Sequence, residues 1–394
     1  MTKTVILGAA RTPIGKMGGG LSTLDATELG GIAIEAALER AGVEPEQVDH
    51  VVMGQVLQAG QGQIPSRQAQ IKAGIPKEVS SETINKVCAS GLRATVILDQ
   101  AIRAGDVQVG VGGGMESMSR APYLLPGARF GFRMGDVKAL DAMVHDGLTN
   151  PFSGKQMFVE ATAVADELEI TRADLDRWAL RSHELALKAT DEGRLSEEIV
   201  PVTVKGRKGD TVVEIDEGPR RDTSLEKLAA LPGLVGKEGS HTAGNSPGVN
   251  DAAGALVVSS EEWASANGRE VLGEIITHAQ SGDDFAYLAR TPASAATKAL
   301  QKAGLSAKDI DVWEINEAFA SVTLNSIRML GIEEERVNVN GGAVALGHPI
   351  GASGARILGS LVLELRRRGG GLGCAAICSG GGQGDAIIVE VNGG

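Results

Sequence analysis

The chain contains two copies of one sequence pattern. Residues 37–42 (ALERAG) are echoed by 299–304 (ALQKAG), 262 positions later. Residues 89–93 (ASGLR) are echoed by 352–356 (ASGAR), 263 positions later. Repeats of a supersecondary unit at one spacing indicate that the same structural element is built twice. The sequence therefore predicts a duplicated α/β unit.

Each copy alternates apolar segments of helical and of strand length. A first strand is expected near residues 5–10, and a Gly follows the helix at 26–41, as is common at a helix C-terminus. Buried strands that alternate with helices predict a parallel or mixed sheet in each half. The further elements that we expect are helices at 88–104, 293–303 and 351–368, and strands at 48–54, 107–114, 310–316 and 372–379.

Residues 120–250 have no counterpart in the repeat. They include an amphipathic segment near 171–191, in which Thr171 and Asp174 have the spacing of a capping box, and a charged hairpin-like stretch at 202–214. An insertion of this size above the loop ends of a sheet is typical of a segment that covers a binding site.

Composition excludes several classes of protein. The net charge of -12 argues against nucleic-acid binding, which needs a basic face, although a local basic cluster would suffice for a small anion. Three Cys in 394 residues argue against a disulfide framework and favour a reducing compartment. No apolar run approaches the roughly 18 residues of a membrane span. We expect a soluble cytoplasmic protein without a signal peptide.

Two residues at the helix starts are candidates for nucleophilic chemistry. Cys88 opens the first of the two repeated helices, where unpaired amides and the helix dipole favour a thiolate, and His348 lies on a Gly-His-Pro turn before the second. If the halves are related by a pseudo-twofold axis, the two helix starts face each other. Cys88 and His348 would then meet at this axis.

Three further segments could contribute to a site. Cys378 ends a strand before a Gly run whose amides could face a ligand oxygen. Cys374, four residues earlier, is interpreted as a small core residue. The two Cys together are weak evidence for a zinc site. Asn316 and Glu317 follow another strand and are either a polar floor or a helix N-cap. The segment GGGMES at 112–117 is not a dinucleotide-binding fingerprint.

Together these segments resemble the thiolase superfamily, and within it the tetrameric acetyl-CoA acetyltransferases. The resemblance covers essentially the whole chain. Six motifs in order carry it: NKVCASG around Cys88, GGGMES at 112–117, NEAF at 316–319, NVNGG at 338–342, GHP at 347–349 and CSGGGQG at 378–384.

The resemblance implies a fold and a division of the chain. It implies two similar halves with mixed five-stranded sheets in a layered αβαβα arrangement, plus an inserted loop domain. The N-terminal half would comprise 1–119 and 251–268, the inserted domain 120–250, and the C-terminal half 269–394. Residues 123–148 resemble a tetramerisation loop, which implies a homotetramer built as a dimer of dimers.

The resemblance also implies a ping-pong Claisen reaction without a cofactor, in which two acetyl-CoA give acetoacetyl-CoA and CoA. Cys88 would carry the acyl group, His348 would take its proton, and Cys378 would move a proton of the second substrate. His348 and a water on Asn316 would hold the enolate, and the amides of Cys88 and Gly380 would form a second oxyanion hole. Substrate-binding residues implied by the resemblance are Leu148, Met157, Arg220, Ala243, Gly244, Ala318 and Phe319.

Some positions depart from the family pattern. Pro247 stands where Ser or Thr is usual, Ala252 where Gly is usual, and Phe158 follows Met157 where Gly is frequent. Arg220 matches an Arg that contacts the nucleotide end of CoA. We expect further cations for the polyphosphate from nearby positions, namely Lys205, Arg207, Lys208 and Arg221.

Three alternative functions remain open. The first is a degradative 3-ketoacyl-CoA thiolase of fatty-acid β-oxidation with broader chain length. The second is a decarboxylating ketoacyl synthase of the same fold, which would lack a Cys at position 378. The third is a lipid-carrier-like or scaffold protein with a decayed site, against which the intact Cys88, His348 and Cys378 argue.

Overall fold

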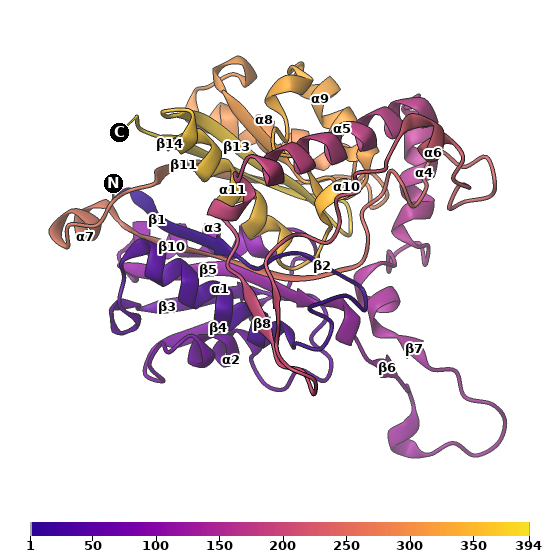
Figure 1. Cartoon of the computed structure of the whole chain (residues 1–394), viewed down its shortest axis with the longest axis horizontal. Helices are drawn as coiled ribbons and strands as arrows, with labels where there is room; N and C mark the ends of the chain where they lie inside the picture. The colour runs from indigo at the N-terminus through magenta and orange to yellow at the C-terminus, as the bar shows by residue number, and fades with distance from the viewer. Residues whose placement is uncertain (1, 394) are drawn as a thin grey trace.

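The computed structural model describes residues 2–393 and is built from two similar halves (Figure 1). In the N-terminal half the strand order is β1-β10-β5-β3-β4, where β5, β3 and β4 run parallel and the other neighbours antiparallel. These strands are β1 (Thr4–Arg11), β3 (His50–Gly54), β4 (Ser80–Ile84), β5 (Val109–Ser117) and β10 (Asn250–Ser260).

The C-terminal half repeats this order and polarity. Its strands follow the order β11-β14-β13-β12, with antiparallel pairs except for the parallel pair of β13 and β12. The agreement between the two orders confirms the duplication predicted from the repeat. These strands are β11 (Gly273–Gly282), β12 (Val312–Ile315), β13 (Gly371–Ser379) and β14 (Gln383–Val391).

Two details of the sheets differ from the expectation. The fifth strand of the C-terminal half is reduced to one parallel bridge between Trp313 and Val337. The two sheets are also joined, because Thr4–Ile6 of β1 pairs antiparallel with Gly273–Ile275 of β11. With the short β2 (Gly15–Lys16) on β10, the strands form one continuous ten-stranded sheet.

Helices complete the layered arrangement. α1 (Ala26–Ala41) and α2 (Pro65–Lys72) pack on the outer face of the N-terminal strands, and α8 (Thr291–Ala303) with α9 (Ala320–Leu330) on that of the C-terminal strands. Between the halves lie α3 (Ser90–Ala104) and α11 (Ser353–Arg367), whose apolar side chains share one core cluster with strands of both halves. The predicted αβαβα layering is thereby observed (Figure 1).

Local sequence signals set several helix ends. Gly42 closes α1 in the left-handed conformation, and Thr171 and Asp174 form the predicted capping box at the start of α5. The two central helices begin two residues later than expected, because the residues before Ser90 and Ser353 form turns.

The inserted segment leaves the N-terminal half after β5 and returns in β10. It contains the predicted long helix and the predicted hairpin, and its α4 and α6 lie at one end of the molecule (Figure 1). Its elements are β6 (Tyr123–Leu124), β7 (Leu140–Asp141), α4 (Met157–Glu167), α5 (Arg172–Asp191), β8 (Val202–Val204), β9 (Thr211–Val213) and α6 (Leu225–Ala229). Two short helices, α7 (Glu261–Ala266) and α10 (Ala343–Leu346), follow it.

The starts of α3 and α11 touch through a reciprocal pair of glycines. Gly91 and Gly354 occupy equivalent positions in the two sequence copies. A Cβ on Gly354 would lie 2.1 Å from the backbone N of Leu92, and a Cβ on Gly91 would lie 2.8 Å from the backbone N of Ala355. Each glycine therefore admits the backbone of the opposite helix, which no larger residue could do without displacing it.

No helix within residues 2–393 is both long enough and apolar enough to cross a membrane.

We predict that Gly354→Ala destabilises the protein by about 1–3 kcal/mol or more, the usual cost of overpacking, because the added methyl group would meet rigid backbone. Gly359→Ala on the same helix is the matched control. Its Cβ would meet only the Cβ of Ala9, at 3.5 Å, so Ala should be neutral or stabilise the helix by up to about 1 kcal/mol. Denaturant unfolding of both variants measures the difference; equal midpoints would contradict this account.

Candidate functional site

Cys88 lies in a tightly held turn between β4 and α3. Ser90 closes this turn, since its Oγ accepts from the backbone N of Lys86 at 2.8 Å and donates to the backbone O of Val87 at 2.6 Å. Val87 has a φ of 42°, which is unusual for a β-branched residue. The backbone before the thiol is thus fixed by side-chain hydrogen bonds and presents Cys88 at the start of the helix.

His348 lies on the loop between α10 and α11. Its backbone N donates to Oδ1 of Asn250 at 2.9 Å, and its Nδ1 lies 2.7 Å from Oγ of Ser353. Ser353 Oγ donates to the backbone O of Pro349 at 3.0 Å, so it can accept a hydrogen from Nδ1. Nε2 would then carry the lone pair. Among residues 2–393, no side chain or backbone group bonds to this Nε2.

Cys88 and His348 line one cavity of about 180 Å³. The cavity lies where the two helix starts meet, as the pseudo-twofold argument anticipated. Its apolar walls come from both halves and from the insertion. Four of the predicted substrate-binding residues, Leu148, Met157, Ala318 and Phe319, line it, together with Phe158 and Pro247.

Cys378 and Gly380 lie next to the Cys88 turn. Cys378 ends β13 and is fully buried, and the backbone amide of Gly380 points at the Cys88 thiol. Ser379 Oγ donates to the backbone O of Lys86, which ties the end of β13 to the turn that holds Cys88. The amides of Cys88 and Gly380 are therefore the two donors directed at the Cys88 sulfur.

The electrostatics of the thiols differ from the expectation. Burial raises the pKa of Cys88 to about 12, and this outweighs the lowering by the amides of Cys88 and Gly380. The prediction that the helix start lowers the pKa of Cys88 and favours its thiolate is therefore wrong, because desolvation disfavours the charged form. Burial and the neighbouring Cys88 likewise raise the pKa of Cys378 well above its ordinary value.

Burial also lowers the pKa of His348 to about 3, with a smaller contribution from Arg356. At neutral pH the free protein therefore holds Cys88 as a thiol and His348 as a neutral imidazole. Transfer of the Cys88 proton to His348 is therefore unfavourable in the free protein, and formation of a bond at the sulfur would favour it.

Asn316 and Glu317 have separate environments. Asn316 Nδ2 lies 3.5 Å from His348 Nδ1, and its Oδ1 accepts no hydrogen bond from any residue in 2–393. Glu317 is buried and accepts from Trp178 Nε1, Ser182 Oγ, Asn338 Nδ2 and the backbone N of Val344 at 2.8–3.0 Å. Neither caps α9, whose N-cap is Phe319. The N-cap interpretation is wrong, and Asn316 lies beside His348.

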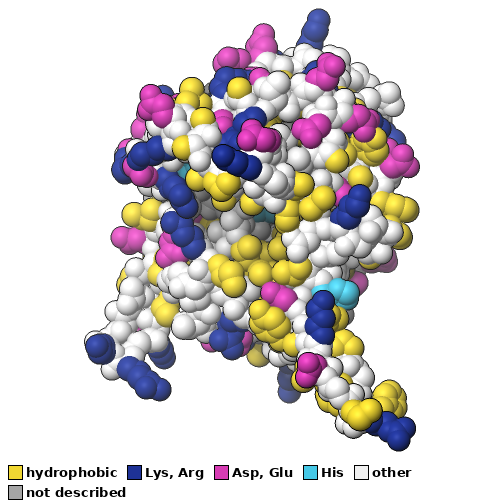
Figure 2. Space-filling model, turned by 90° about the vertical axis from the view of Figure 1, so that its right-hand side faces the viewer, with side chains coloured by type: hydrophobic (Ala, Val, Ile, Leu, Met, Phe, Trp, Pro, Cys, Tyr) yellow, Lys and Arg dark blue, Asp and Glu magenta, His cyan; other side chains and the backbone are white. Residues whose placement is uncertain are grey.

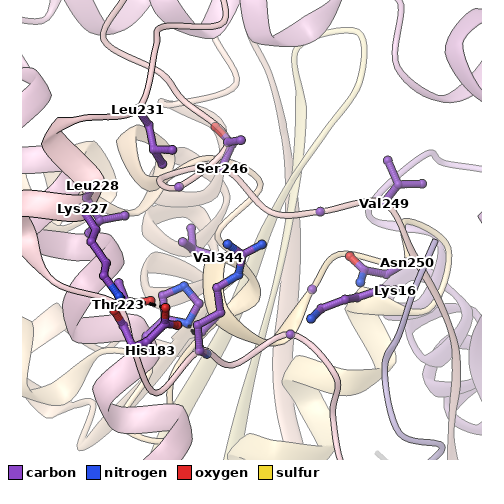
Figure 3. A pocket seen from close by; sticks show the side chains of 18 of the residues that line it. Lys16, His183, Thr223, Lys227, Leu228, Leu231, Ser246, Val249, Asn250 and Val344 are labelled. Atoms are coloured by element: carbon purple, nitrogen blue, oxygen red, sulfur yellow. Dashed lines mark hydrogen bonds and ion pairs between the residues drawn. The ribbon is translucent and has the colours of Figure 1, made fainter. Parts of the chain in front are cut away.

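A second cavity of about 470 Å³ adjoins the first. Three predicted substrate-binding residues, Arg220, Ala243 and Gly244, line it, and Ser246, Gly248 and Val249 line both cavities. Figure 3 shows Lys16, His183 and Lys227 around it. Figure 2 shows the hollowed face of the molecule, with hydrophobic side chains below the hollow and Lys and Arg side chains to its left.

The cations of this second cavity differ from those expected. Arg220, Lys16 and Lys227 line it, whereas Lys205, Arg207 and Lys208 lie between β8 and β9 and are not lining residues. Arg221 Nη2 pairs with Asp191 Oδ1 at 2.5 Å instead. The sequence reasoning missed Lys16, which comes from the N-terminal part of the chain, and Lys227, which follows Arg220 by seven positions on α6.

Sequence reasoning also missed Glu116, within the GGGMES segment. Its buried carboxyl accepts from the backbone N of Val56 and Leu57 at 3.0 Å and of Gly351 at 2.9 Å. Gly351 follows the His348 loop, so Glu116 ties this loop to the N-terminal half. Burial raises the pKa of Glu116 to about 7 despite these three amides. The GGGMES motif contains Glu116, but only the contact with the distant Gly351 reveals its role.

Within the described residues, no cluster of His, Cys, Asp or Glu could hold a metal ion. All three Cys are free and buried, and Cys374, on β13, packs in the core of the C-terminal half, as predicted. The chemistry available to the site is therefore that of two thiols, one imidazole, an amide side chain and directed backbone N–H groups.

Comparison with known proteins agrees with this arrangement. The family model of the thiolase N-terminal domain matches residues 4–262, and that of the thiolase C-terminal domain matches 269–391. The chain is 48% identical to acetyl-CoA acetyltransferases of Syntrophomonas wolfei and of Cupriavidus necator, in each case over 99% of this chain and 100% of the relative.

Solved structures show the same similarity. The acetyl-CoA acetyltransferase structure from Syntrophomonas wolfei superimposes with a TM-score of 0.97 at 42% identity over 100% of both chains. That from Bacillus anthracis gives 0.97 at 41% identity over 99% of both. With both family models in order along a fold that brings Cys88 and His348 into one cavity, the chain belongs to the thiolase family.

Proposed function

We propose that this protein is an acetyl-CoA C-acetyltransferase. It catalyses the reversible condensation of two acetyl-CoA to acetoacetyl-CoA and CoA, with CoA thioesters as substrates and no further cofactor. The observation that carries the proposal is the cavity lined by Cys88 and His348, next to Cys378, which adjoins a second cavity lined by cations. The names of the relatives favour acetyl transfer over a β-oxidation thiolase.

In the first half-reaction Cys88 attacks the carbonyl carbon of acetyl-CoA. Its Sγ forms the bond to carbon while His348 Nε2 takes the thiol proton. The bond between carbon and the CoA sulfur breaks, and Cys378 gives its proton to the departing sulfur. The raised pKa of Cys378 keeps this proton in place until a strong base, the CoA thiolate, appears. The acyl-Cys88 form then holds a protonated His348 opposite a Cys378 thiolate.

In the second half-reaction the Cys378 thiolate takes a proton from the methyl group of another acetyl-CoA. The resulting carbanion attacks the acyl carbon on Cys88, and the Cys88 sulfur leaves and regains its proton from His348. Every proton returns to its starting group, so the cycle balances. Thiolysis is the reverse, in which Cys378 activates the CoA thiol.

Two anionic oxygens arise and need separate donors. The amides of Cys88 and Gly380 suit the oxyanion of the tetrahedral intermediate on Cys88. Protonated His348 and a water bound to Asn316 suit the enolate of the second substrate. Directed donors in a buried site are typically worth about 3–4 kcal/mol each to a transition state.

The second cavity suits the nucleotide end of CoA. Arg220 and Lys16 offer positive charge for phosphates in an otherwise acidic protein, and Lys227 adds a cation that pairs with Asp222 Oδ2 at 2.9 Å in the free protein. Gly244 also lines this cavity, and it is packed against the side chains of Leu228 and Leu231, which a Cβ there would meet at 2.6 Å. We further propose a cytoplasmic location and a role in lipid metabolism.

The small first cavity predicts a preference for short acyl chains. Thiolysis of acetoacetyl-CoA should be at least about tenfold more efficient, in kcat/KM, than thiolysis of 3-ketohexanoyl-CoA, because the cavity of about 180 Å³ is small and is lined by the bulky side chains of Met157, Phe158 and Phe319. Initial rates across 3-ketoacyl-CoA chain lengths measure this. Rates that rise with chain length would favour the degradative thiolase.

The proposed roles of Cys88 and Cys378 predict different effects when each thiol is removed. Cys378→Ala should keep acetylation of Cys88 by acetyl-CoA, although more slowly, and lose about 10²–10⁴-fold in condensation, the usual scale for a positioned acid–base group. Cys88→Ala should abolish the acetyl label, which peptide mass spectrometry detects.

Cys374→Ala is the control, because Cys374 lies in the core away from both cavities. It should change stability modestly and leave both half-reactions intact. An acetyl label on Cys374 or Cys378 in place of Cys88 would overturn the assignment.

We also propose a homotetramer, a dimer of dimers, assembled through the segment 123–148. Its β6 and β7 form a ribbon whose connection projects from the body of the molecule (Figure 1). Phe130 is 91% and Met134 98% exposed on this projection. Apolar side chains so exposed are typical of an association surface.

Charges on this projection should therefore prevent the assembly of dimers into tetramers. Phe130→Asp combined with Met134→Asp is expected to give dimers, whereas Val271→Asp, at an exposed apolar residue outside the segment, should leave the tetramer intact. Analytical ultracentrifugation at micromolar concentration distinguishes these species. A wild-type monomer, or a tetramer that survives both charges, would refute the proposal.

A further inference from the structure

We infer that Lys86 and Asp385 form a positioning pair, which holds the glycine turn at 380–382 in place. The amide of Gly380 in this turn points at the Cys88 sulfur, so the pair would fix one of the two donors for the oxyanion formed on Cys88. The inference rests on the proposed function, because it concerns the acyl transfer at the same thiol. Lys86 Nζ lies 2.6 Å from Asp385 Oδ2.

Asp385 is a carboxylate on an otherwise apolar face of β14. Ile387 and Val389 belong to the core cluster that the central helices share, and the alternation along a strand places Asp385 on the same face. Asp385 is 1% exposed, and apart from its ion pair neither Oδ atom accepts a hydrogen bond within residues 2–393. Burial raises its pKa, and Lys86 makes the largest opposing contribution. The charge of Asp385 therefore depends on Lys86.

The ammonium group of Lys86 contacts two neighbouring strands. Its Nζ also donates to Gln280 Oε1 at 2.7 Å. Gln280 on β11 is the direct partner of Asp385 in the antiparallel register of β11 and β14. Side chains of directly opposed residues in such a pair lie on the same face of the sheet. The ammonium is therefore held by two strands of the C-terminal half at once.

The backbone of Lys86 is bound to the other side of the glycine turn. Ser379, the last residue of β13, donates from its Oγ to the backbone O of Lys86. The turn at 380–382 connects β13 to β14, on which Asp385 lies. Lys86 is therefore tied to both strands that the turn connects, to β13 through its carbonyl oxygen and to β14 through its ammonium group.

The glycine turn has no side chains that could fix the direction of its amides. Gly381 and Gly382 have φ of 76° and 68°, in the left-handed region that glycine adopts readily. One backbone hydrogen bond, from Asp283 N to Gly382 O at 2.8 Å, holds the far end of the turn. The position of the near end, where the amide of Gly380 lies, then depends on the contacts with the Cys88 turn.

Loosening the pair should slow the chemistry without weakening substrate binding. Ser90 fixes the Cys88 turn internally, so the nucleophile should stay in place. A donor stabilises an oxyanion only from the correct position, and a displacement of about 1 Å can cost about 10²-fold in rate. Because the oxyanion arises only during the reaction, its loss lowers kcat and leaves KM nearly unchanged.

The test compares Asp385→Asn with Asp99→Asn. Asp99 is a matched control, because it is also 1% exposed and pairs with Arg103 Nε at 2.8 Å, while it lies within α3 and lines neither cavity. Asp385→Asn should lower the kcat for thiolysis of acetoacetyl-CoA, and the single-turnover rate of Cys88 acetylation, about 10- to 100-fold. Its KM should change less than about twofold, and Asp99→Asn should change kcat and KM less than about twofold.

Three further readouts separate positioning from general stabilisation. Both Asn variants should unfold at a lower temperature than wild type, since each removes a buried charge partner, yet only Asp385→Asn should lose kcat. Lys86→Met should lose as much kcat as Asp385→Asn, and Lys86→Arg should stay within about fivefold of wild type, because Arg offers a charge to the same acceptors. The double variant of Lys86→Met and Asp385→Asn should be no slower than either single variant, because the two residues act as one unit.

The inference is overturned if folded Asp385→Asn or Lys86→Met keeps the wild-type kcat, if Asp99→Asn loses as much, or if the two losses multiply in the double variant. Should Asp385→Asn fail to fold, Lys86→Met decides alone, because the Asp385 left in it can take up a proton and lose its charge. A wild-type protein that neither binds CoA nor cleaves acetoacetyl-CoA would instead refute the proposed function, so the two failures are distinguishable.

Discussion

The contact between Gly91 and Gly354 is the constraint on which the rest of the site depends. Two helices whose starts approach backbone to backbone leave room for no side chain between them. This close approach brings the turn of Cys88 and the loop of His348 into one cavity, although they lie 260 residues apart in the chain. Glu116 strengthens the same junction, because its carboxyl group accepts hydrogen bonds from backbone amides of both halves. A duplicated unit thus produces one site at its symmetry axis, with different residues from each copy.

Burial at this junction determines how the chemistry can proceed. The same desolvation that raises the pKa of Cys88 lowers that of His348, so neither group is charged in the free protein. Activation therefore depends on proton transfer coupled to the attack on the thioester. Directed amides from Cys88 and Gly380 can then stabilise charge that develops only during the reaction, which is the general basis of electrostatic catalysis.

The insertion determines access to this junction. Its loops contribute to both cavities and separate them by a neck at Ser246, Gly248 and Val249. The two cavities have different ends, with cations in one and the thiols beside the other. This arrangement matches a long substrate that has phosphates at one end and a thioester at the other. The same insertion carries the exposed apolar projection at Phe130 and Met134, so the cavity walls and this projection belong to one segment.

The sequence by itself determined the duplication, the main elements, the family and the candidate residues of the site, because repeats, helix caps and short motifs are local features of the chain. Cys378 was distinguished from Cys374 in this way, by the Gly run that follows it. Only the tertiary structure decided the protonation of Cys88, the cations of the second cavity and the contacts of Glu116. The thiol pKa depends on desolvation by residues from both halves, Lys16 reaches Arg220 from about 200 residues away, and Glu116 meets Gly351 from 235 positions away. Burial and long-range contacts of this kind arise from packing, and no local pattern of residues encodes them.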